Sequence, residues 1–262
     1  FETWQNAATN IQAAVDYAGS NGIATVQLTN ETYTILAQIQ VTNAVTVCGA
    51  GRANTIVRRS VTGDTAPKHR IFRLNHAGAV VEALRMQYGH ADNSGSGTGT
   101  RGGGAEVILG QVLDCEIANS MGYGGAYYGL GIYLDGAGAV VSNCVIYASN
   151  GGSHPVGGGA YVNAGALMTH CTLRDYTGFS STGAEGAGAY VNGGVLRWCR
   201  IYNNLSFCTG GVGIHVANNA AGLVEYCTVT SNVTPSQYSA NGIGIYMAGA
   251  GTVRNCLVAF NR

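Results

Sequence analysis

One residue type recurs at a nearly constant interval in this chain, and that recurrence limits the folds open to it. Six cysteines share this interval: Cys115, Cys144, Cys171, Cys199, Cys227 and Cys256. Each stands two positions before an aliphatic side chain. A steady period, here about 28 residues, indicates a solenoid in which every repeat adds one turn. We expect Met86, one period before Cys115, to hold the same place in the preceding turn.

A second motif recurs in phase with the cysteines. It is Gly-x-Gly followed by a small or aliphatic residue, a large polar or aromatic residue and an aliphatic residue, and its copies begin at Gly102, Gly129, Gly157, Gly186, Gly211 and Gly242. Such alternation predicts a short strand after a glycine turn. A dinucleotide-binding glycine motif needs a following helix, and here a strand follows. We therefore interpret these glycines as tight turns.

The cysteine column is expected to face inward. Cysteine behaves as a small buried hydrophobe, and the aliphatic residue two positions later belongs on the same face of a strand. Adjacent turns lie about 4.8 Å apart, within reach of a disulfide, so a few bridges remain open as an alternative. No Cys-x-x-Cys pair occurs. We expect neither a metal site nor a cofactor.

The N-terminal segment is predicted to form a cap. Ile11, Ala14, Val15 and Ala18 share one face of an amphipathic helix, with Thr9 or Asn10 as its N-cap. A solenoid needs such a cover, because its first turn would otherwise expose apolar side chains and unpaired strand edges. Residues 1–22 are thus interpreted as the cap, and residues 23–262 as a parallel β-helix forming a single domain with it.

The N-terminal third carries a resemblance to a known family. Residues 11–16 read Ile-Gln-Ala-Ala-Val-Asp, residues 32–34 read Thr-Tyr-Thr, and residues 45–51 read Val-Thr-Val-Cys-Gly-Ala-Gly before Thr-Ile-Val at 55–57. This order resembles the start of the pectin-lyase-like right-handed parallel β-helix proteins. The later turns resemble glycine-rich repeats of secreted bacterial β-helices and autotransporter passenger regions. The resemblance implies an all-β, right-handed parallel β-helix of about 28 residues per turn, on a fold that serves many functions.

The amino-acid composition excludes some classes of function. The formal net charge is zero and charged residues make up 10% of the chain, so no electrostatic reason exists for binding nucleic acid. No apolar stretch is long enough to predict a membrane span. The chain begins at Phe1, which suits a mature or trimmed product. The resemblance implies an extracellular or cell-surface location.

One outward column is a candidate binding surface. The large residue of the glycine motif is Glu106 in the first copy, and then Tyr133, Tyr161, Tyr190, His215 and Tyr246. Stacked at the spacing of parallel strands, these rings would form an aromatic strip that binds sugar rings or a protein. The alternative is that the stack only stabilises an exposed sheet.

A second outward column lies just before each cysteine and is chemically mixed: Arg85, Asp114, Asn143, His170, Trp198, Tyr226 and Asn255. Asp114 of this column is close in sequence to Glu116, and Asp135 is expected one turn on. These three and His170 are the best available participants in the alternative, a polysaccharide lyase or glycoside hydrolase. Against this, the chain lacks the Asn-Thr-Asp, Asp-Asp, Gly-His-Asp and Arg-Ile-Lys set implied by resemblance to a polygalacturonase. It also lacks the aspartate cluster with a downstream arginine of a calcium pectate lyase.

The remaining candidate binding regions are the loops and one basic segment. The predicted loops leave the solenoid at the same phase and should gather on one side, where binding is expected: 119–129, 148–158, 175–187, 203–211 and 231–242. Residues 58–78 hold much of the positive charge, either as a solvated loop or as a contact for an anionic glycan. Asn30, Asn204 and Asn232 fit glycosylation sequons, a weak signal in asparagine-rich turns.

The last predicted turn ends at Arg262 without a capping helix. Such an end would expose an apolar turn, so either the natural chain continues or another subunit covers it, and head-to-tail stacking would build a filament. The sequence therefore favours a non-catalytic structural or binding β-helix that presents loops and an aromatic strip to glycans or protein partners at the cell surface. End-to-end assembly is a further expectation.

Overall fold

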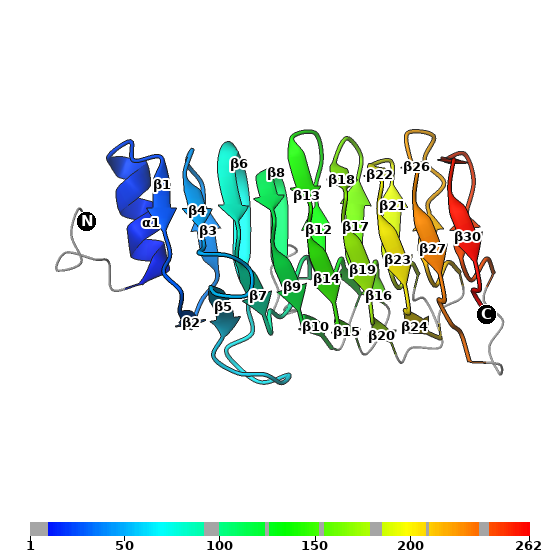
Figure 1. Ribbon diagram of the computed structural model, residues 1–262, viewed down its shortest axis with the longest axis horizontal. Helices are drawn as coiled ribbons and strands as arrows, with labels where there is room; N and C mark the ends of the chain where they lie inside the picture. Colours follow the sequence, from blue (N-terminus) through cyan, green and yellow to red (C-terminus); the bar gives the residue numbers. More distant parts are fainter. Residues whose placement is uncertain are drawn as a thin grey trace.

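A computed structural model describes residues 10–91, 100–123, 126–151, 155–178, 185–207, 210–235 and 241–262. Short strands follow one another in turns that stack along a single axis, with one helix at the N-terminal end (Figure 1). All pairings between the named strands are parallel, which confirms the predicted parallel β-helix.

The largest sheet has 15 strands in two rows. Two long strands, β6 (Phe72–Glu82) and β8 (Ala105–Leu113), bend through both rows and join them. The other strands of the first row are β3 (Ile39–Val41), β12 (Ile132–Leu134), β17 (Ala160–Asn163), β21 (Ala189–Asn192), β25 (Ile214–Val216) and β28 (Ile245–Met247). Those of the second row are β1 (Thr25–Gln27), β4 (Thr46–Cys48), β13 (Ala139–Ser142), β18 (Leu167–Thr169), β22 (Val195–Arg197), β26 (Leu223–Glu225) and β29 (Thr252–Arg254).

A nine-stranded sheet forms the third side of the solenoid. Its strands are β2 (Thr32–Ile35), β5 (Ile56–Arg59), β7 (Arg85–Gln87), β9 (Glu116–Ala118), β14 (Val145–Tyr147), β19 (Thr172–Arg174), β23 (Arg200–Tyr202), β27 (Thr228–Thr230) and β30 (Leu257–Ala259). Loop residues add two small parallel sheets beside it. One holds β10 (Met121–Gly122), β15 (Asn150–Gly151), β20 (Thr177–Gly178) and β24 (Leu205–Ser206), and the other holds β11 (Tyr127–Tyr128) and β16 (Pro155–Val156).

The cysteines stand at the corner between the second row and the nine-stranded sheet, here called the first corner. Cys144, Cys171, Cys199 and Cys227 are each 1% exposed, Cys115 is fully buried and Cys256 is half-buried. The six thiols are free, as is that of Cys48, so the inward column is confirmed and the disulfide alternative does not apply to them. Cys208 lies outside the described residues.

The register corrects one expectation. Met86 pairs with Ile117, not with Cys115, and Leu84 occupies the place of the cysteine in the preceding turn. The prediction was wrong because the chain from β7 to β9 is longer than a later turn, so a constant period could not be extended backwards.

Each corner requires a left-handed backbone residue. At the first corner φ is 50–55° at Ala83, Asp114, Asn143, His170, Trp198, Tyr226 and Asn255. At the second corner, where the nine-stranded sheet ends, φ is 52–60° at Tyr88, Asn119, Ala148, Asp175, Asn203, Ser231 and Phe260. Asparagine and aspartate tolerate this conformation, whereas bulky side chains rarely adopt it.

An asparagine ladder lies inside the second corner. Asn204 Nδ2 donates to Asn232 Oδ1 at 2.8 Å, and Asn232 Nδ2 donates to Asn261 Oδ1 at 2.9 Å. Asn204 is 1% exposed and Asn232 is fully buried. Two of the three sequons are therefore internal structural asparagines in the folded chain.

The glycine motif serves the stacking of turns. Gly129 has φ +58°, and a Cβ on Gly131 would lie 2.3 Å from the carbonyl oxygen of Gly159 in the next turn. The interpretation of these glycines as turn residues is confirmed, with the added reason that successive turns pass too close for a side chain.

Helix α1 (Ile11–Ser20) covers the first turn. Asn10 is its N-cap, accepting a hydrogen bond from Ala13 N at 2.8 Å. Gln12 bonds both the N–H and the carbonyl of Gln40 in β3, and so occupies part of an otherwise open strand edge. The predicted helical cap is present, and residues 1–9 lie outside the described part. No helix in the described ranges has the length and apolar character that crossing a membrane requires.

Candidate functional site

The predicted aromatic column stacks, but it is largely covered. Ring centroids are 5.1 Å apart between Tyr133 and Tyr161, 5.1 Å between Tyr161 and Tyr190, and 4.7 Å between Tyr190 and His215. His215 and Tyr246 meet edge-on at 5.0 Å. Only 3% of Tyr133, 8% of Tyr161 and 3% of His215 is exposed, whereas Tyr190 and Tyr246 are half-buried. The expectation of an open aromatic strip is wrong for Tyr133, Tyr161 and His215.

Loop strands provide the cover. Tyr128 of β11 meets Tyr161 at 5.5 Å with the rings at 89°, and the guanidinium of Arg101 lies 4.7 Å from the centre of the Tyr133 ring. Burial raises the pKa of Tyr133, Tyr161 and Tyr190. A raised pKa opposes use of these phenols as bases near neutral pH.

Two of the four catalytic candidates lie near one another at the first corner. Asp114 is more than half exposed and receives a hydrogen bond from Asn143, with Arg52 at 4.0 Å. Glu116 accepts from Arg85 Nε at 2.7 Å and from the Tyr147 hydroxyl at 3.4 Å. The Glu116 carboxylate is therefore engaged in an ion pair.

The remaining two candidates lie elsewhere. Asp135 follows β12 and pairs with Arg101 at 3.4 Å, while its backbone N–H bonds Val107 near the start of β8. Asp114 follows the opposite end of β8. His170 occupies the same corner as Asp114 two turns further on, about 10 Å away at the strand spacing. The four residues thus form no single catalytic cluster.

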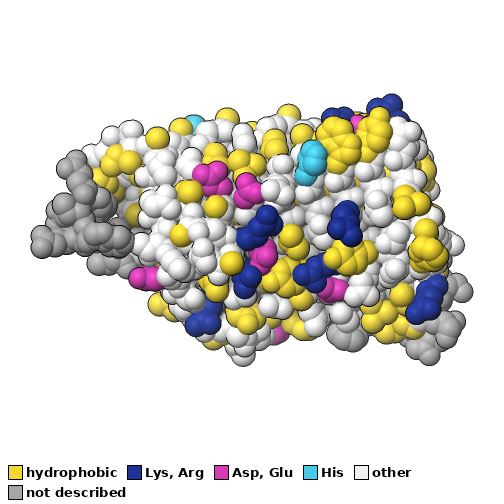
Figure 2. Space-filling model, in the orientation of Figure 1, with side chains coloured by type: hydrophobic (Ala, Val, Ile, Leu, Met, Phe, Trp, Pro, Cys, Tyr) yellow, Lys and Arg dark blue, Asp and Glu magenta, His cyan; other side chains and the backbone are white. Residues whose placement is uncertain are grey.

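The structure reveals another aromatic surface, the aromatic ridge, which we define as His170, Trp198 and Tyr226. Ring centroids are 4.9 Å apart between His170 and Trp198 and 5.8 Å apart between Trp198 and Tyr226. Trp198 and Tyr226 are each 48% exposed, and His170 is exposed as well. Figure 2 shows a histidine beside large hydrophobic and basic side chains along the upper edge of the face.

The backbone beneath the aromatic ridge disfavours aromatic residues. φ is 53° at His170, 50° at Trp198 and 54° at Tyr226. The equivalent corner residues in neighbouring turns are Asn143 and Asn255, which suit this conformation. Placing a bulky L-residue there costs about 1–2 kcal/mol. Three successive costly residues on an open surface point to a function for the side chains.

Charged residues flank the aromatic ridge. Glu225, 2% exposed, accepts from Arg197 Nε at 2.5 Å and from Arg254 Nε at 2.7 Å. Desolvation raises the pKa of Glu225, but the hydrogen bonds from Arg254 and Arg197 outweigh it and leave that pKa below its ordinary value. Arg197 also lies 5.4 Å from the centre of the Trp198 ring. The carboxylate thus holds two guanidinium groups beside the ridge.

Most of the basic segment 58–78 is committed to internal contacts. Arg59 is 1% exposed and Arg70 is 5% exposed. Arg70 and Arg73 bond the buried Glu106 at 2.7 and 3.0 Å. These contacts favour a structural role over the anionic-glycan contact considered for this segment.

The sequence carried a usable signal for the aromatic ridge. At the position before each cysteine, Asp114, Asn143 and Asn255 are residues that suit a turn, whereas His170, Trp198 and Tyr226 are consecutive aromatic exceptions. The column as a whole is chemically mixed, and of these three aromatic residues only His170 is among the residues predicted for catalysis. Within the described ranges, no three His, Cys, Asp or Glu side chains gather in a way that would hold a metal ion.

Similar solved structures share low sequence identity with this chain. ORF18 of Geobacillus virus E2 is 14% identical, with a TM-score of 0.44. The alignment covers 97% of this chain but only 59% of the length of ORF18. The A-module of mannuronan C-5 epimerase AlgE4 from Azotobacter vinelandii is 13% identical with a TM-score of 0.35, covering 95% and 94%. An alginate lyase from a Paenibacillus species is 12% identical with a TM-score of 0.38, covering 97% and 98%.

Because the sequence identities and TM-scores are this low, the similarities do not indicate an activity or a ligand for this chain. No protein of curated function matches the sequence. A family model described as right-handed β-helix region matches residues 105–262. Because that match spans more than half of the chain, the chain belongs to the right-handed β-helix family.

Proposed function

We propose that this protein is a non-catalytic, extracellular or cell-surface β-helix that binds a glycan through the aromatic ridge. The observation that carries the proposal is the exposed row of His170, Trp198 and Tyr226 on left-handed backbone that would accept asparagine at lower cost. Folding alone gives no reason for such a row.

The chemistry of the aromatic ridge suits sugars. Trp and Tyr combine apolar rings with an N–H or O–H at the rim, and sugars likewise combine apolar faces with hydroxyl groups. Arg197 and Arg254 add hydrogen-bond donors beside the rings, held in place by Glu225. The turns hold the three rings 4.9 and 5.8 Å apart, so several weak contacts along one glycan chain can act together.

Binding is supported over glycan cleavage by the placement of the acidic groups. Glu116 is paired with Arg85, and Asp135 is paired with Arg101 at the other end of β8 from Asp114. A glycoside hydrolase needs two carboxyl groups flanking one bond. If Asp114→Ala with Glu116→Ala abolished a measured cleavage of any polysaccharide, the lyase or hydrolase alternative would replace this proposal.

The test combines a glycan array with tryptophan fluorescence. The chain has two tryptophans, so a Trp4→Phe variant leaves Trp198 as the sole reporter. We expect array-selected glycans to change its emission in a saturable manner. On the array, where no tryptophan reporter is needed, Trp198→Asn and Tyr226→Asn should each weaken binding about tenfold or more, as expected for loss of an aromatic contact.

A matched control is Asn143→Gly, which alters the same corner outside the aromatic ridge and keeps a residue that tolerates φ 53°. Its glycan affinity should equal that of the unaltered protein. If Trp198→Asn and Tyr226→Asn bound the glycan as tightly as the unaltered protein does, the proposal would be contradicted. If no glycan on the array is bound, and the unaltered protein captures a defined surface protein that Trp198→Asn does not capture, the aromatic ridge would instead be assigned to a protein partner.

End-to-end association is a separate part of the proposal. In the turn that contains β30, Leu257 is 60% exposed, Val258 47% and Phe260 85%. Apolar side chains and an unpaired strand edge favour pairing with another β-helix turn. Sedimentation velocity over a concentration series should show oligomers that Phe260→Asp and Leu257→Lys remove. Monomers at all concentrations would exclude this part while leaving glycan binding untouched.

A further inference from the structure

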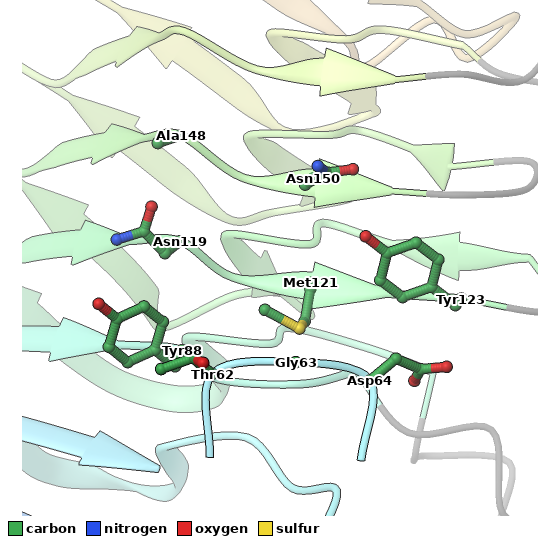
Figure 3. A pocket seen from close by; sticks show the side chains of 9 residues that line it. All are labelled: Thr62, Gly63, Asp64, Tyr88, Asn119, Met121, Tyr123, Ala148 and Asn150. Carbon is green, nitrogen blue, oxygen red and sulfur yellow. The ribbon is translucent and has the colours of Figure 1, made fainter. Parts of the chain in front are cut away.

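A cavity of about 420 Å³ lies at the second corner, whereas the aromatic ridge lies at the first corner, at the other end of the strands of the nine-stranded sheet. Its chemistry is carried by Asp64, Tyr88, Asn119, Met121, Tyr123 and Asn150, whose arrangement is shown in Figure 3. The volume is near the lower end of that of ordinary small-molecule sites, roughly 300–1,000 Å³. Such a space suits a ligand of one or two rings, not a long chain segment.

One wall of the cavity is held rigid by a buried arginine. Arg59 donates to the carbonyl oxygens of Gly63 at 2.5 Å, Thr65 at 2.8 Å and Pro67 at 3.0 Å, and to that of Tyr88 at 2.7 Å. These bonds tie the loop to the second corner. A preformed wall lowers the ordering cost of binding.

The hydrogen bonds that hold the Asp64 carboxylate all go to one of its two oxygens. Its Oδ1 accepts from His90 Nε2 at 2.7 Å and from Lys68 Nζ at 2.6 Å. Within the described residues, its Oδ2 has no hydrogen-bond partner. Burial raises the pKa of Asp64, but the hydrogen bonds from Lys68 and His90 outweigh it and hold that pKa below the ordinary value. The free oxygen is therefore a fixed, charged acceptor.

The other lining groups are amides and apolar surface. The Oδ1 of Asn150 is buried and lacks a partner among the described residues. Asn119, one turn earlier, brings a second amide into the lining. Figure 3 shows Met121 between Tyr88 on one side and Tyr123 on the other. Arg59 Nη2 contacts the Met121 sulfur at 3.5 Å, which helps to fix the floor.

We propose that this cavity binds a neutral sugar unit, at a site separate from the aromatic ridge. A carboxylate acceptor and two amides, which both donate and accept, match a set of hydroxyl groups. Two tyrosines and a methionine match the apolar face of a sugar ring. The cations near the cavity are already engaged, Lys68 with Asp64 and Arg59 with four carbonyl oxygens, so neither is free to bind the carboxylate of an anionic sugar. None of the ridge residues lines this cavity.

The test uses glucose, galactose, mannose, N-acetylglucosamine and the anionic glucuronate as probes, with saturation-transfer NMR to detect binding and calorimetry to measure affinity. At least one neutral sugar should bind more tightly than glucuronate. Asn119→Gly removes the amide at a position with φ 55°, and Tyr123→Ala removes a ring that is 37% exposed, so neither should disturb folding. Each should weaken binding about tenfold, as expected for one lost contact.

Asn143→Gly, which alters neither the cavity lining nor the aromatic ridge, is the matched control and should bind the sugar as the unaltered protein does. Thermal unfolding of every variant confirms that the fold is kept. Undiminished affinity in both Asn119→Gly and Tyr123→Ala would overturn the proposal, as would glucuronate binding at least as tightly as the neutral sugars. The absence of saturation transfer from all five probes would also overturn it. Because the cavity and the aromatic ridge share no residue, variants of one leave the other unchanged, and failure here and failure of glycan binding at the ridge are distinguishable.

Discussion

The indole of Trp198 lies 5.8 Å from the phenol of Tyr226, with their planes 24° apart, although a whole turn of the solenoid separates them along the chain. Both rings project from the same left-handed corner in successive turns. The solenoid period therefore converts two isolated aromatic residues into a continuous surface.

We predict that these two rings can be removed without loss of stability. In Trp198→Asn or Tyr226→Asn, the lost stacking costs about 0.5–1.5 kcal/mol. Relief of the left-handed backbone offsets this by about 1–2 kcal/mol. Urea unfolding should therefore show a change below about 1 kcal/mol in either variant. A loss of several kcal/mol would mean that the aromatic ridge is retained for folding instead of binding.

The asparagine ladder should behave in the opposite way. Asn232→Ala removes the acceptor of the Asn204 backbone N–H at 3.2 Å and of Asn204 Nδ2 at 2.8 Å, and the donor that bonds the Ile201 carbonyl at 3.2 Å. Unsatisfied buried polar groups cost about 1–3 kcal/mol each, so the free energy of unfolding should fall by about 2–4 kcal/mol. Urea denaturation measures the change. The neighbouring Asn203→Gly, at an exposed position with φ 55°, should cost far less.

The buried thiols should resist chemical modification. Burial raises the pKa of Cys115, Cys144, Cys171 and Cys199, and the thiolate is the reactive form. Burial and the neighbouring Glu82 raise the pKa of Cys48 too, but Cys48 is only half-buried, so in the native protein it should react with a thiol reagent well before these four. Peptide mapping by mass spectrometry after timed labelling gives the order. Rapid labelling of Cys144 or Cys171 under native conditions would indicate local opening of the first corner.

Stability should decline in mild acid, in part through His90. Burial lowers the pKa of His90 in the folded state, with the nearby Arg59 and Lys68 acting in the same direction and Asp64 opposing them. The unfolded chain, with a histidine pKa of about 6.5, then binds more protons below that pH. Stability is therefore present above about pH 6.5 and is lost as the pH falls, by at most about 1.4 kcal/mol per pH unit for one histidine.

His90→Gln keeps a donor for Asp64 and removes the titration. Thermal unfolding between about pH 7.5 and pH 5 should show a smaller decline in this variant than in the unaltered protein. His69 and His215 also have pKa values lowered by burial and should sustain the rest of the decline. An identical pH profile in the variant would show that His90 does not contribute.

The inward side of the solenoid was predictable because it repeats. A cysteine and an aliphatic residue two positions apart, recurring once per turn, identify the buried face of a strand wherever the period holds. The glycine motif was predictable for a similar reason, since a turn repeats its local geometry. The prediction failed at Met86, where the turn is longer and no cysteine marks the register.

The outward side of the solenoid was harder to predict. The alternation of residues along a strand separates inward from outward side chains, but it does not indicate which other segments cover the outward ones. Tyr133 and Tyr161 point out from their strands, yet Arg101 and the loop strand that holds Tyr128 lie over them. The cavity beside Asp64 depends on contacts between Arg59 and residues far along the chain, such as Met121. Nothing in the local pattern of residues 59–68 indicates those contacts.

The sequence by itself determined the period, the buried cysteine column, the glycine turns and the helical cap, because these depend on residue spacing and short-range backbone preference. The tertiary structure alone decided which aromatic column is open, which arginines pair with the carboxylates, and where a cavity forms. Those outcomes depend on how loops of one turn pack against strands of another, and that packing is set by contacts between segments that are distant in the chain.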